Sequence, residues 1–293
     1  MQEVSTRFER QTDNSALCCG EENAVSCRVS VVIPALNEEA NLPFVLPKIP
    51  TWVHEVILVD GQSTDRTVDV ARILVPNIRV VQQLGKGKGA ALRAGFEAAT
   101  GDIIVMLDAD GSTLPTEIPA YIGPLLAGAD FVKGSRFLQG GGTADMPAYR
   151  RWGNHLLVSL VRLLFGGRYS DLCYGYNAFW SSAVRRLDLD CDGFEVETLM
   201  NVRALRVGLR VAEVPSFEDR RIHGTSNLRT IPDGWRVLCT ILSEWRRSIF
   251  GDVTPHRQAG PSLQFPADGP RARVDLAEIL ISNREQQDGQ AAA

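Results

Sequence analysis

The sequence has few of the residues from which metal clusters and disulfide frameworks are built. Its four histidines are scattered along the chain, and its six cysteines form no Cys-x-x-Cys pair. A zinc site is therefore not expected. We interpret the cysteines, three of which (Cys18, Cys19 and Cys27) precede the first strand-like segment, as reduced thiols of a cytoplasmic protein.

Long apolar runs and an excess of positive charge are also absent. The first 22 residues are polar and lack the apolar centre of a secretory signal. The nearest candidate for a membrane span, residues 156–165, is too short and contains Arg162. The net charge of −4 argues against a nucleic-acid-binding surface. A composition of 44% hydrophobic and 23% charged residues is that of a globular protein.

The sequence contains an alternation of short apolar runs with helical patterns. Five such runs fall within about a hundred residues, a spacing typical of parallel βαβ crossovers. We therefore predict an α/β fold, a doubly wound, mainly parallel sheet flanked by helices. The predicted strands are 29–33, 56–59, 79–81, 103–107 and 131–132, and the predicted helices begin near Glu38 (ending by Pro47), near Ser63, at Lys88 and within 116–126.

The second half of the chain is less regular. Helices are predicted over 154–165, 182–187 and 195–207, and a strand over 209–214. Apolar residues at helical spacing around Trp235 predict a last helix. The apolar residues of this helix and of segment 156–165 could either pack in the core of the protein or lie on a membrane surface. Residues 1–28 are predicted to be a flexible leader, and residues 251–293 a mostly disordered tail.

Two acids, Asp108 and Asp110, follow the apolar run 103–107. Carboxylates at the end of a buried strand need a positive partner, because unpaired charges are costly to bury. A divalent cation with oxygen ligands, Mg²⁺ or Mn²⁺, would meet this need and would usually bring a phosphate. The same short pattern fits two solvated turn acids equally well.

Polar residues follow several predicted strands. The carboxyl ends of parallel strands share one edge of the sheet, where open α/β sheets bind ligands. We therefore expect these side chains to converge on one crevice: Asn37, Asp60, Lys86, Lys88, Asp108 and Asp110.

The glycine-rich segment 85–89 opens a predicted helix and contains Lys86 and Lys88. Glycines there would let backbone N–H groups approach a phosphate, although a solvated basic turn is the alternative. The spacing is not that of a Walker A loop, and no Gly-x-Gly-x-x-Gly follows the first strand. Among the arginines, Arg136 and Arg220 are the favoured phosphate clamps.

Two glutamates, Glu195 and Glu197, follow Gly193-Phe194. One of them could act as a general base or contact a sugar hydroxyl. The exposed start of a helix is an equally good interpretation of this pair.

Taken in order, these motifs resemble family 2 glycosyltransferases, which have the GT-A fold. The order looks like that of the dolichol-phosphate (polyprenyl-phosphate) mannose synthase branch. The resemblance implies one domain over 29–250, with a nucleotide-binding half at 29–135 and an acceptor half at 136–250. The matching segments are 31–39, 59–65, 86–89, 108–110, 134–137, 171–176, 193–197 and 220–227.

The resemblance also implies roles for individual residues. Asp108 and Asp110 would hold the donor and its Mg²⁺ or Mn²⁺, and Asp171 would shape the acceptor side. Arg136 and Arg220 would lie near donor or acceptor phosphates. Asp110, Arg136, Asp171 and Glu197 are thus the catalytic candidates, and the nucleotide-sugar-binding candidates are Pro34, Asn37, Glu38, Asp60, Asp65, Lys86, Lys88, Asp108 and Arg220.

This chain departs from the family in three respects. Ser112 stands where many relatives have Gln, and Asn227 stands where many have Lys. The C-terminal membrane helices of some relatives are also missing, which leaves a soluble acceptor open.

The implied activity is an inverting transfer of a hexose, mannose or glucose, from a GDP- or UDP-sugar to a polyprenyl phosphate. We expect a cytoplasmic enzyme, peripheral on the inner face of the membrane, with no nucleic-acid partner. A lipid phosphate is already an anion and needs no strong base, whereas a hydroxyl acceptor would need Glu195 or Glu197. The alternatives are a soluble hydroxyl acceptor, a sugar nucleotidyltransferase, which would want a glycine-rich loop after the first strand, and a non-catalytic nucleotide-sugar binder.

Overall fold

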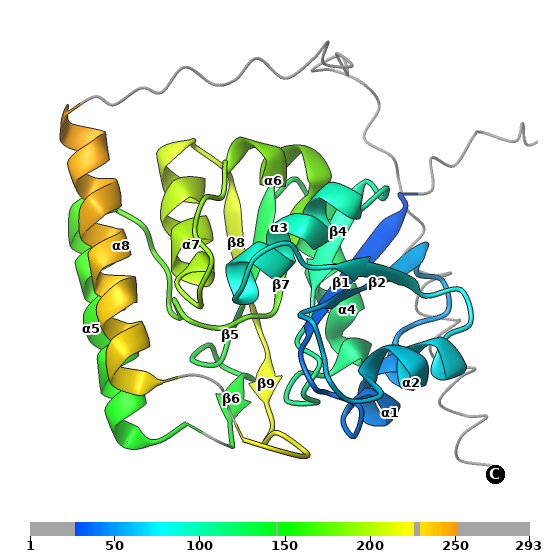
Figure 1. Cartoon of the computed structure of the whole chain (residues 1–293). Helices are drawn as coiled ribbons and strands as arrows, with labels where there is room; N and C mark the ends of the chain where they lie inside the picture. The colour runs from blue at the N-terminus through cyan, green and yellow to red at the C-terminus, as the bar shows by residue number, and fades with distance from the viewer. Residues whose placement is uncertain (1–26, 145, 226–228, 251–293) are drawn as a thin grey trace, which may run out of the picture.

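The centre of the fold is a seven-stranded sheet (Figure 1). The computed structural model describes residues 27–144, 146–225 and 229–250, so the predicted tail and nearly all of the predicted leader lie outside the described residues. Only β7 runs antiparallel to its neighbours, which confirms the predicted mainly parallel sheet. In spatial order the strands are β3 (Arg79–Gln82), β2 (Glu55–Asp60), β1 (Val29–Ala35), β4 (Ile103–Met106), β7 (Asn177–Trp180), β5 (Phe131–Ser135) and β8 (Val211–Pro215).

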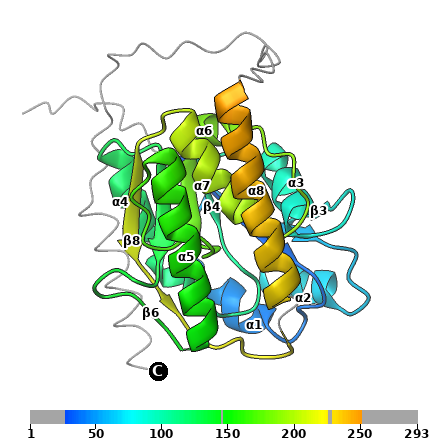
Figure 2. The ribbon, with the colours of Figure 1, turned by 90° about the vertical axis from the view of Figure 1, so that its left-hand side faces the viewer.

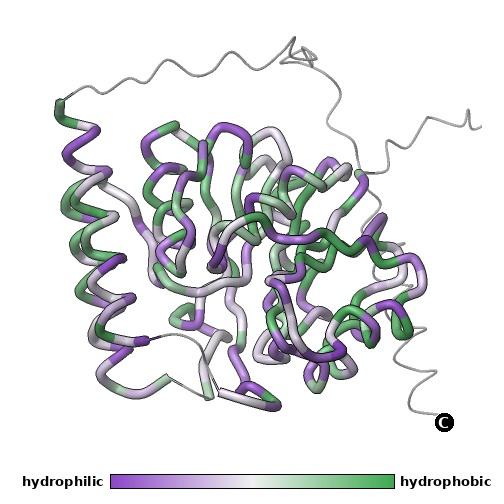
Figure 3. The backbone as a smooth tube through the Cα atoms, viewed as in Figure 1, coloured by the Kyte–Doolittle hydropathy of each residue, from purple (hydrophilic) through white to green (hydrophobic). Residues whose placement is uncertain are grey.

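Helices cover both faces of this sheet, and each face has its own apolar core. Side chains alternate along a strand, so Val31 and Ile33 enter one core while Val32 enters the other. The central strands can therefore be largely apolar, and green predominates along them in Figure 3. The first core packs against α1 (Leu42–Val45), α2 (Thr67–Leu74) and α4 (Ile118–Leu126), and the second against α3 (Lys88–Ala98), α6 (Ser181–Arg186) and α7 (Val196–Arg206).

The structure differs from the predicted elements in several places. The helix predicted from Glu38 is only the four residues of α1 and a 3₁₀ turn, η1 (Leu46–Lys48), because prolines interrupt the segment. The antiparallel β7 was not predicted, since four residues are too few to show a period. A small parallel pair, β6 (Gly142–Thr143) with β9 (Phe217–Glu218), and the 3₁₀ turn η2 (Pro115–Glu117) were also not predicted.

Two long helices, α5 (Ala148–Phe165) and α8 (Thr230–Phe250), stand side by side beyond the sheet (Figure 2). A third apolar cluster joins them to α7 through residues such as Val161, Val202 and Ile241. Glu244 of α8 is buried and binds Arg203 and Arg206 of α7, which anchors the helix by charge as well. In the part of the chain described here, no helix combines the length and apolarity needed to cross a bilayer.

Candidate active site

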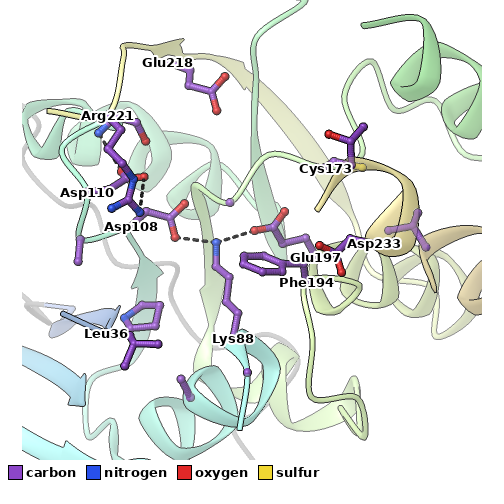
Figure 4. A pocket seen from close by; sticks show the side chains of 18 of the residues that line it. Leu36, Lys88, Asp108, Asp110, Cys173, Phe194, Glu197, Glu218, Arg221 and Asp233 are labelled. Atoms are coloured by element: carbon purple, nitrogen blue, oxygen red, sulfur yellow. Dashed lines mark hydrogen bonds and ion pairs between the residues drawn. The ribbon is translucent and has the colours of Figure 1, made fainter. Parts of the chain in front are cut away.

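A cavity of about 660 Å³ opens at the carboxyl edge of the sheet. The ends of β1 and β4, the starts of α3 and α7, and one side each of α5 and α8 form its walls. Figure 4 shows charged side chains converging on it from these separate elements. Of the residues predicted from the sequence, those that line it are Pro34, Glu38, Lys86, Lys88, Asp108, Asp110, Arg136 and Glu197.

The two acids after β4 both face this cavity, and each has a cationic partner. Asp108 Oδ1 lies 2.6 Å from Lys88 Nζ, and Asp110 Oδ2 lies 3.4 Å from Arg221 Nη2. Both carboxylates remain partly exposed to the cavity. The acids are therefore a shared, charge-balanced pair rather than two solvated turn residues.

Lys88 bridges two carboxylates from opposite walls. Its Nζ lies 2.7 Å from Glu197 Oε1, in addition to the contact with Asp108. Burial alone would lower the pKa of Lys88, but the charges of Asp108 and Glu197 outweigh it and raise that pKa. Gly175 packs directly on this triad, since a Cβ there would lie 2.7–2.8 Å from one terminal atom of each member.

Of the two glutamates left open by the sequence, Glu197 lines the cavity and Glu195 does not. Glu195 turns back to accept the N–H of Gly193. Burial raises the pKa of the Glu197 carboxyl, and the ammonium of Lys88 opposes that rise. Glu197 is thus a buried carboxylate held next to a cation, and not a solvated residue at a helix start.

Arg221, and not its predicted neighbour Arg220, faces the cavity. Arg221 Nη1 lies 3.0 and 3.1 Å from the two carboxylate oxygens of Glu38, so it links the ends of β1 and β4. Its Nε is buried and has no hydrogen-bond partner among the described residues. Arg220 is exposed, and its Nε lies 3.4 Å from the carbonyl oxygen of Ala144.

Backbone contacts hold Arg221 in this position. The N–H of Asp219 donates to the carbonyl of Ser112 at 2.8 Å. The side chain of Ile222 packs against Gly111, whose φ of +80° and lack of a Cβ make room for it. The sequence alone cannot tell which of two adjacent arginines points inward, because this depends on how the loop after β9 lies on the loop after β4.

Two glycines of segment 85–89, Gly87 and Gly89, have a packing role that the sequence did not predict. The N–H of Gly89 donates to the carbonyl of Asp192 at 2.8 Å, so it is not available to a phosphate. A Cβ at Gly87 or Gly89 would collide with the backbone carbonyls of Asp192 and Cys191 respectively. These glycines allow two backbone segments to approach closely, while Lys86 and Lys88 bring the positive charge to the cavity.

Gly89→Ala is therefore expected to destabilise the protein by about 1–3 kcal/mol, because the methyl group must push the 191–193 segment away from α3. Gly123→Ala is the matched control, since nothing lies within 4 Å of a Cβ at this position in α4. We expect the control to be neutral or stabilising by about 0.5–1 kcal/mol. Urea unfolding of the two variants measures the difference, and equal effects would contradict the packing role of Gly89.

Three predicted nucleotide-binding residues, Asn37, Asp60 and Asp65, are not among the residues that line the cavity. Two of them, Asn37 and Asp65, tie the loop after β1 to the loop after β2. Asn37 Oδ1 accepts the N–H of Thr64 at 2.8 Å, and Asp65 accepts the N–H of Glu39 at 3.2 Å. Asp60 is buried and accepts the N–H of Ser63 at 3.2 Å. Their contact with a base and ribose stays a prediction.

Arg136 and Asp171 form a buried ion pair on the other side of the cavity. Asp171 oxygens lie 2.7 Å from Arg136 Nε and 2.9 Å from Nη2. Burial would raise the pKa of Asp171, but the guanidinium charge overcomes this and holds it below its ordinary value. Arg136 lines the cavity and Asp171 does not, so Asp171 acts on the cavity by positioning Arg136.

The carboxylate oxygens of this cavity fit a hard divalent cation that is bound together with a phosphate-bearing substrate. Asp108 and Asp110 supply carboxylate oxygens, and no group of three histidine, cysteine, aspartate or glutamate side chains forms a closed metal site in the described ranges. Mg²⁺ is commonly held in this way, by one or two carboxylates, waters and substrate phosphates. In this structure Lys88 and Arg221 form ion pairs with these two carboxylates.

Comparison with known proteins agrees with this geometry. The family described as "Glycosyl transferase family 2" matches residues 30–188. The chain is 33% identical over 211 residues to an undecaprenyl-phosphate mannosyltransferase of Micrococcus luteus, covering 67% of this chain and 85% of the relative. It is 31% identical to a dolichol-phosphate mannosyltransferase of Pyrococcus furiosus, over 69% of this chain but only 59% of that protein.

Among solved structures, glucosyl-3-phosphoglycerate synthase of Mycobacterium tuberculosis is similar. The crystal structure of its complex with Mn²⁺, UDP-glucose and phosphoglyceric acid has a TM-score of 0.60 and 29% identity, covering 75% of this chain and 80% of that one. Another crystal of that enzyme contains Mg²⁺ and UDP. The predicted GT-A fold and glycosyltransferase activity are thereby confirmed, and the chain belongs to glycosyl transferase family 2.

Proposed function

We propose that this glycosyltransferase moves a hexose from a nucleoside-diphosphate sugar to a polyprenyl phosphate. The observation that carries the proposal is the cavity itself. At one end it has the acids Asp108 and Asp110 with their cations, and at the other it is lined by two helices, α5 and α8, whose outer faces expose apolar residues. The names of the curated relatives support the lipid phosphate as acceptor.

The donor would lie at the acidic end. Asp108 and Asp110 would hold Mg²⁺ or Mn²⁺, which when bound neutralises the diphosphate and stabilises it as a leaving group. Lys86 and Lys88 line this end and supply further positive charge. Arg221 would turn its unsatisfied Nε–H to a donor phosphate oxygen.

Arg221→Ala is expected to lower kcat/KM by about 100-fold, because a guanidinium contact with a phosphate is lost. Arg220→Ala is the matched comparison, and we expect it to cost far less, since its side chain is directed at the carbonyl of Ala144. Steady-state kinetics with a varied nucleotide sugar measures both. A larger loss in the Arg220 variant would reverse the assignment.

The acceptor would lie near Arg136 and Arg150, which line the other end. A phosphate-monoester oxygen attacks the anomeric carbon from the face opposite the diphosphate. The new carbon–oxygen bond forms as the bond to the nucleoside diphosphate breaks, with inversion. The acceptor oxygen is already anionic, so Glu197 can remain paired with Lys88 instead of acting as a base.

We further propose that the outer faces of α5 and α8 dock on the membrane surface. Tryptophans and arginine pairs beside apolar residues are typical of interfacial helices. The inner faces of the same helices line the cavity, so a lipid phosphate could reach it from the bilayer. The exposed apolar residues are Trp152, Leu156 and Leu163 on α5, and Ile231, Trp235, Leu242, Trp245, Ile249 and Phe250 on α8, while Tyr149 of α5 is exposed and also lines the cavity.

Replacing both Trp152 and Trp235 with glutamate is expected to weaken binding to anionic lipid vesicles by at least about tenfold, because two exposed rings leave the interface. Vesicle sedimentation measures the loss, and circular dichroism checks the fold. A double variant at exposed polar positions, Arg185→Gln with Arg72→Gln, gives the same change in net charge away from these helices. Equal loss in both double variants would contradict docking through α5 and α8.

A second candidate acceptor is a soluble phosphorylated hydroxy compound, suggested by the structural similarity to glucosyl-3-phosphoglycerate synthase. One experiment separates the two. The protein is incubated with Mg²⁺ or Mn²⁺, a panel of GDP- and UDP-hexoses, and either a short prenyl phosphate or phosphoglyceric acid. Product on the prenyl phosphate supports the proposal, and product on phosphoglyceric acid alone overturns it.

A further inference from the structure

Arg136 already binds an internal anion on the side that faces the cavity. Its Nη1 lies 3.1 and 3.0 Å from Oε1 and Oε2 of Glu218, in addition to the two contacts with Asp171. One guanidinium thus serves two carboxylates, and the cluster has a net charge of −1. Such a cluster would repel an anionic acceptor unless one carboxylate yields its place.

The two carboxylates differ in how firmly they are held. Asp171 is fully buried and also accepts backbone N–H groups from Arg136 at 3.3 Å and Cys173 at 3.2 Å. The Glu218 side chain is 22% exposed and stands on the cavity wall, where Figure 4 labels it. It comes from β9, a two-residue strand paired only with the two-residue β6. Glu218 is therefore the carboxylate that can move.

Glu218 also has the contacts that a phosphate would use. Both of its oxygens approach Arg136, and Oε2 accepts the hydroxyl of Thr143 at 2.7 Å. A phosphate monoester presents oxygens of similar spacing to a guanidinium, with more negative charge than a carboxylate. The same arginine edge and the same hydroxyl can thus receive either anion.

We propose that Glu218 sets the selectivity for the acceptor by acting as a displaceable internal anion on Arg136. The acceptor phosphate takes its place, so acceptors without a phosphate cannot release Arg136 from Glu218. This inference rests on the proposed function for the identity of the acceptor. Glu218 acts through Arg136 and is a positioning residue.

The test compares Glu218→Gln with Asp219→Asn. Gln keeps the size of Glu218 but removes the charge and one of its two acceptor oxygens. Asp219 is the neighbouring acid on the same cavity wall, and it accepts the N–H of Arg220 instead of pairing with Arg136. Asp219→Asn therefore makes the same change in charge without releasing Arg136. We measure binding of farnesyl phosphate by calorimetry, with Mg²⁺ and nucleoside diphosphate present, and then the acceptor and donor KM.

We expect Glu218→Gln to bind farnesyl phosphate about tenfold more tightly, with a matching fall in acceptor KM and no change in donor KM. Asp219→Asn should stay within about twofold of the wild type. Unchanged or weaker binding in Glu218→Gln, or an equal gain in both variants, would overturn the inference. If Glu218→Gln does not fold, Glu218→Ala removes the same carboxylate and leaves Arg136 and Thr143 in place, and it must also bind farnesyl phosphate more tightly.

These outcomes are separable from a failure of the proposed function. Binding of farnesyl phosphate is measured without turnover, whereas the proposed function fails if wild-type protein makes no prenyl-phosphate hexose. A gain in binding without any transfer would sustain the role of Glu218 and reject the acceptor. Transfer to a prenyl phosphate by the wild type, without tighter binding in Glu218→Gln, would support the acceptor and reject the role of Glu218.

Discussion

Asp110→Asn is expected to lower kcat by about a thousandfold or more, with little change in the free energy of unfolding. Asparagine keeps the size of the side chain and the hydrogen bond from the N–H of Ser112 at 3.0 Å. It removes the negative charge that would hold the cation on the diphosphate, and such charge stabilisation contributes several kcal/mol to the transition state. A loss of about 4 kcal/mol corresponds to three orders of magnitude in rate.

Asp102→Asn is the matched control for that variant. Asp102 precedes the same strand, β4, at the opposite edge of the sheet, and its carboxylate lies 3.6 Å from Arg28. We expect it to keep nearly full activity, because no part of Asp102 lines the cavity. Release of nucleoside diphosphate in the presence of acceptor measures both variants. More than about a tenth of wild-type turnover in Asp110→Asn would contradict the role of this acid.

Lys88→Met is expected to destabilise the protein by about 3–5 kcal/mol, the usual cost of removing one member of a buried ion pair. The loss would leave Asp108 and Glu197 facing each other across the cavity without the cation that lies 2.6 and 2.7 Å from them. Lys86→Met is the control, since Lys86 is exposed. Adding Glu197→Gln to Lys88→Met should restore part of the stability. Urea unfolding of all four proteins, wild type included, measures these differences.

The stability deficit of Lys88→Met should also depend on pH. Burial raises the pKa of Glu197, and without Lys88 the main charge that opposes the rise is lost. A carboxyl whose pKa is higher in the folded than in the unfolded protein binds more protons when folded, so it gains stability as the pH falls. The deficit should therefore be smaller at pH 5 than at pH 8. A deficit that grows on acidification would show that Lys88 does not compensate Glu197.

Much of the fold could be predicted from the sequence because the nucleotide-binding half is built from local patterns. Strands β1, β2 and β4 are continuous apolar runs, each followed by polar residues that a parallel sheet must bring to one edge. Strand β7 could not be predicted in this way, since its place between β4 and β5 depends on long-range pairing. The segment around α1 was predicted to form a longer helix than it does, because prolines interrupt the helix there.

The site residues that could be predicted from the sequence are those whose position at the end of a strand or the start of a helix fixes where they lie. Asp108, Asp110 and Lys88 stand at strand and helix ends, so topology alone brings them together. Arg221 was missed in favour of Arg220 because the direction of a loop side chain depends on what the loop packs against. The anion on Arg136 was not foreseen either, since Glu218 lies 82 residues away along the chain and meets it only through β9.

Binding of Mn²⁺, followed by electron paramagnetic resonance, tests the central claim most directly. That claim is that Asp108 and Asp110 gather a divalent cation which holds the diphosphate of the donor. Free Mn²⁺ should be bound weakly by the protein alone, because Lys88 and Arg221 already pair with these acids. Binding should tighten strongly when nucleoside diphosphate is added, and the gain should vanish in Asp110→Asn but persist in Asp102→Asn. A gain of equal size in Asp110→Asn would contradict the claim.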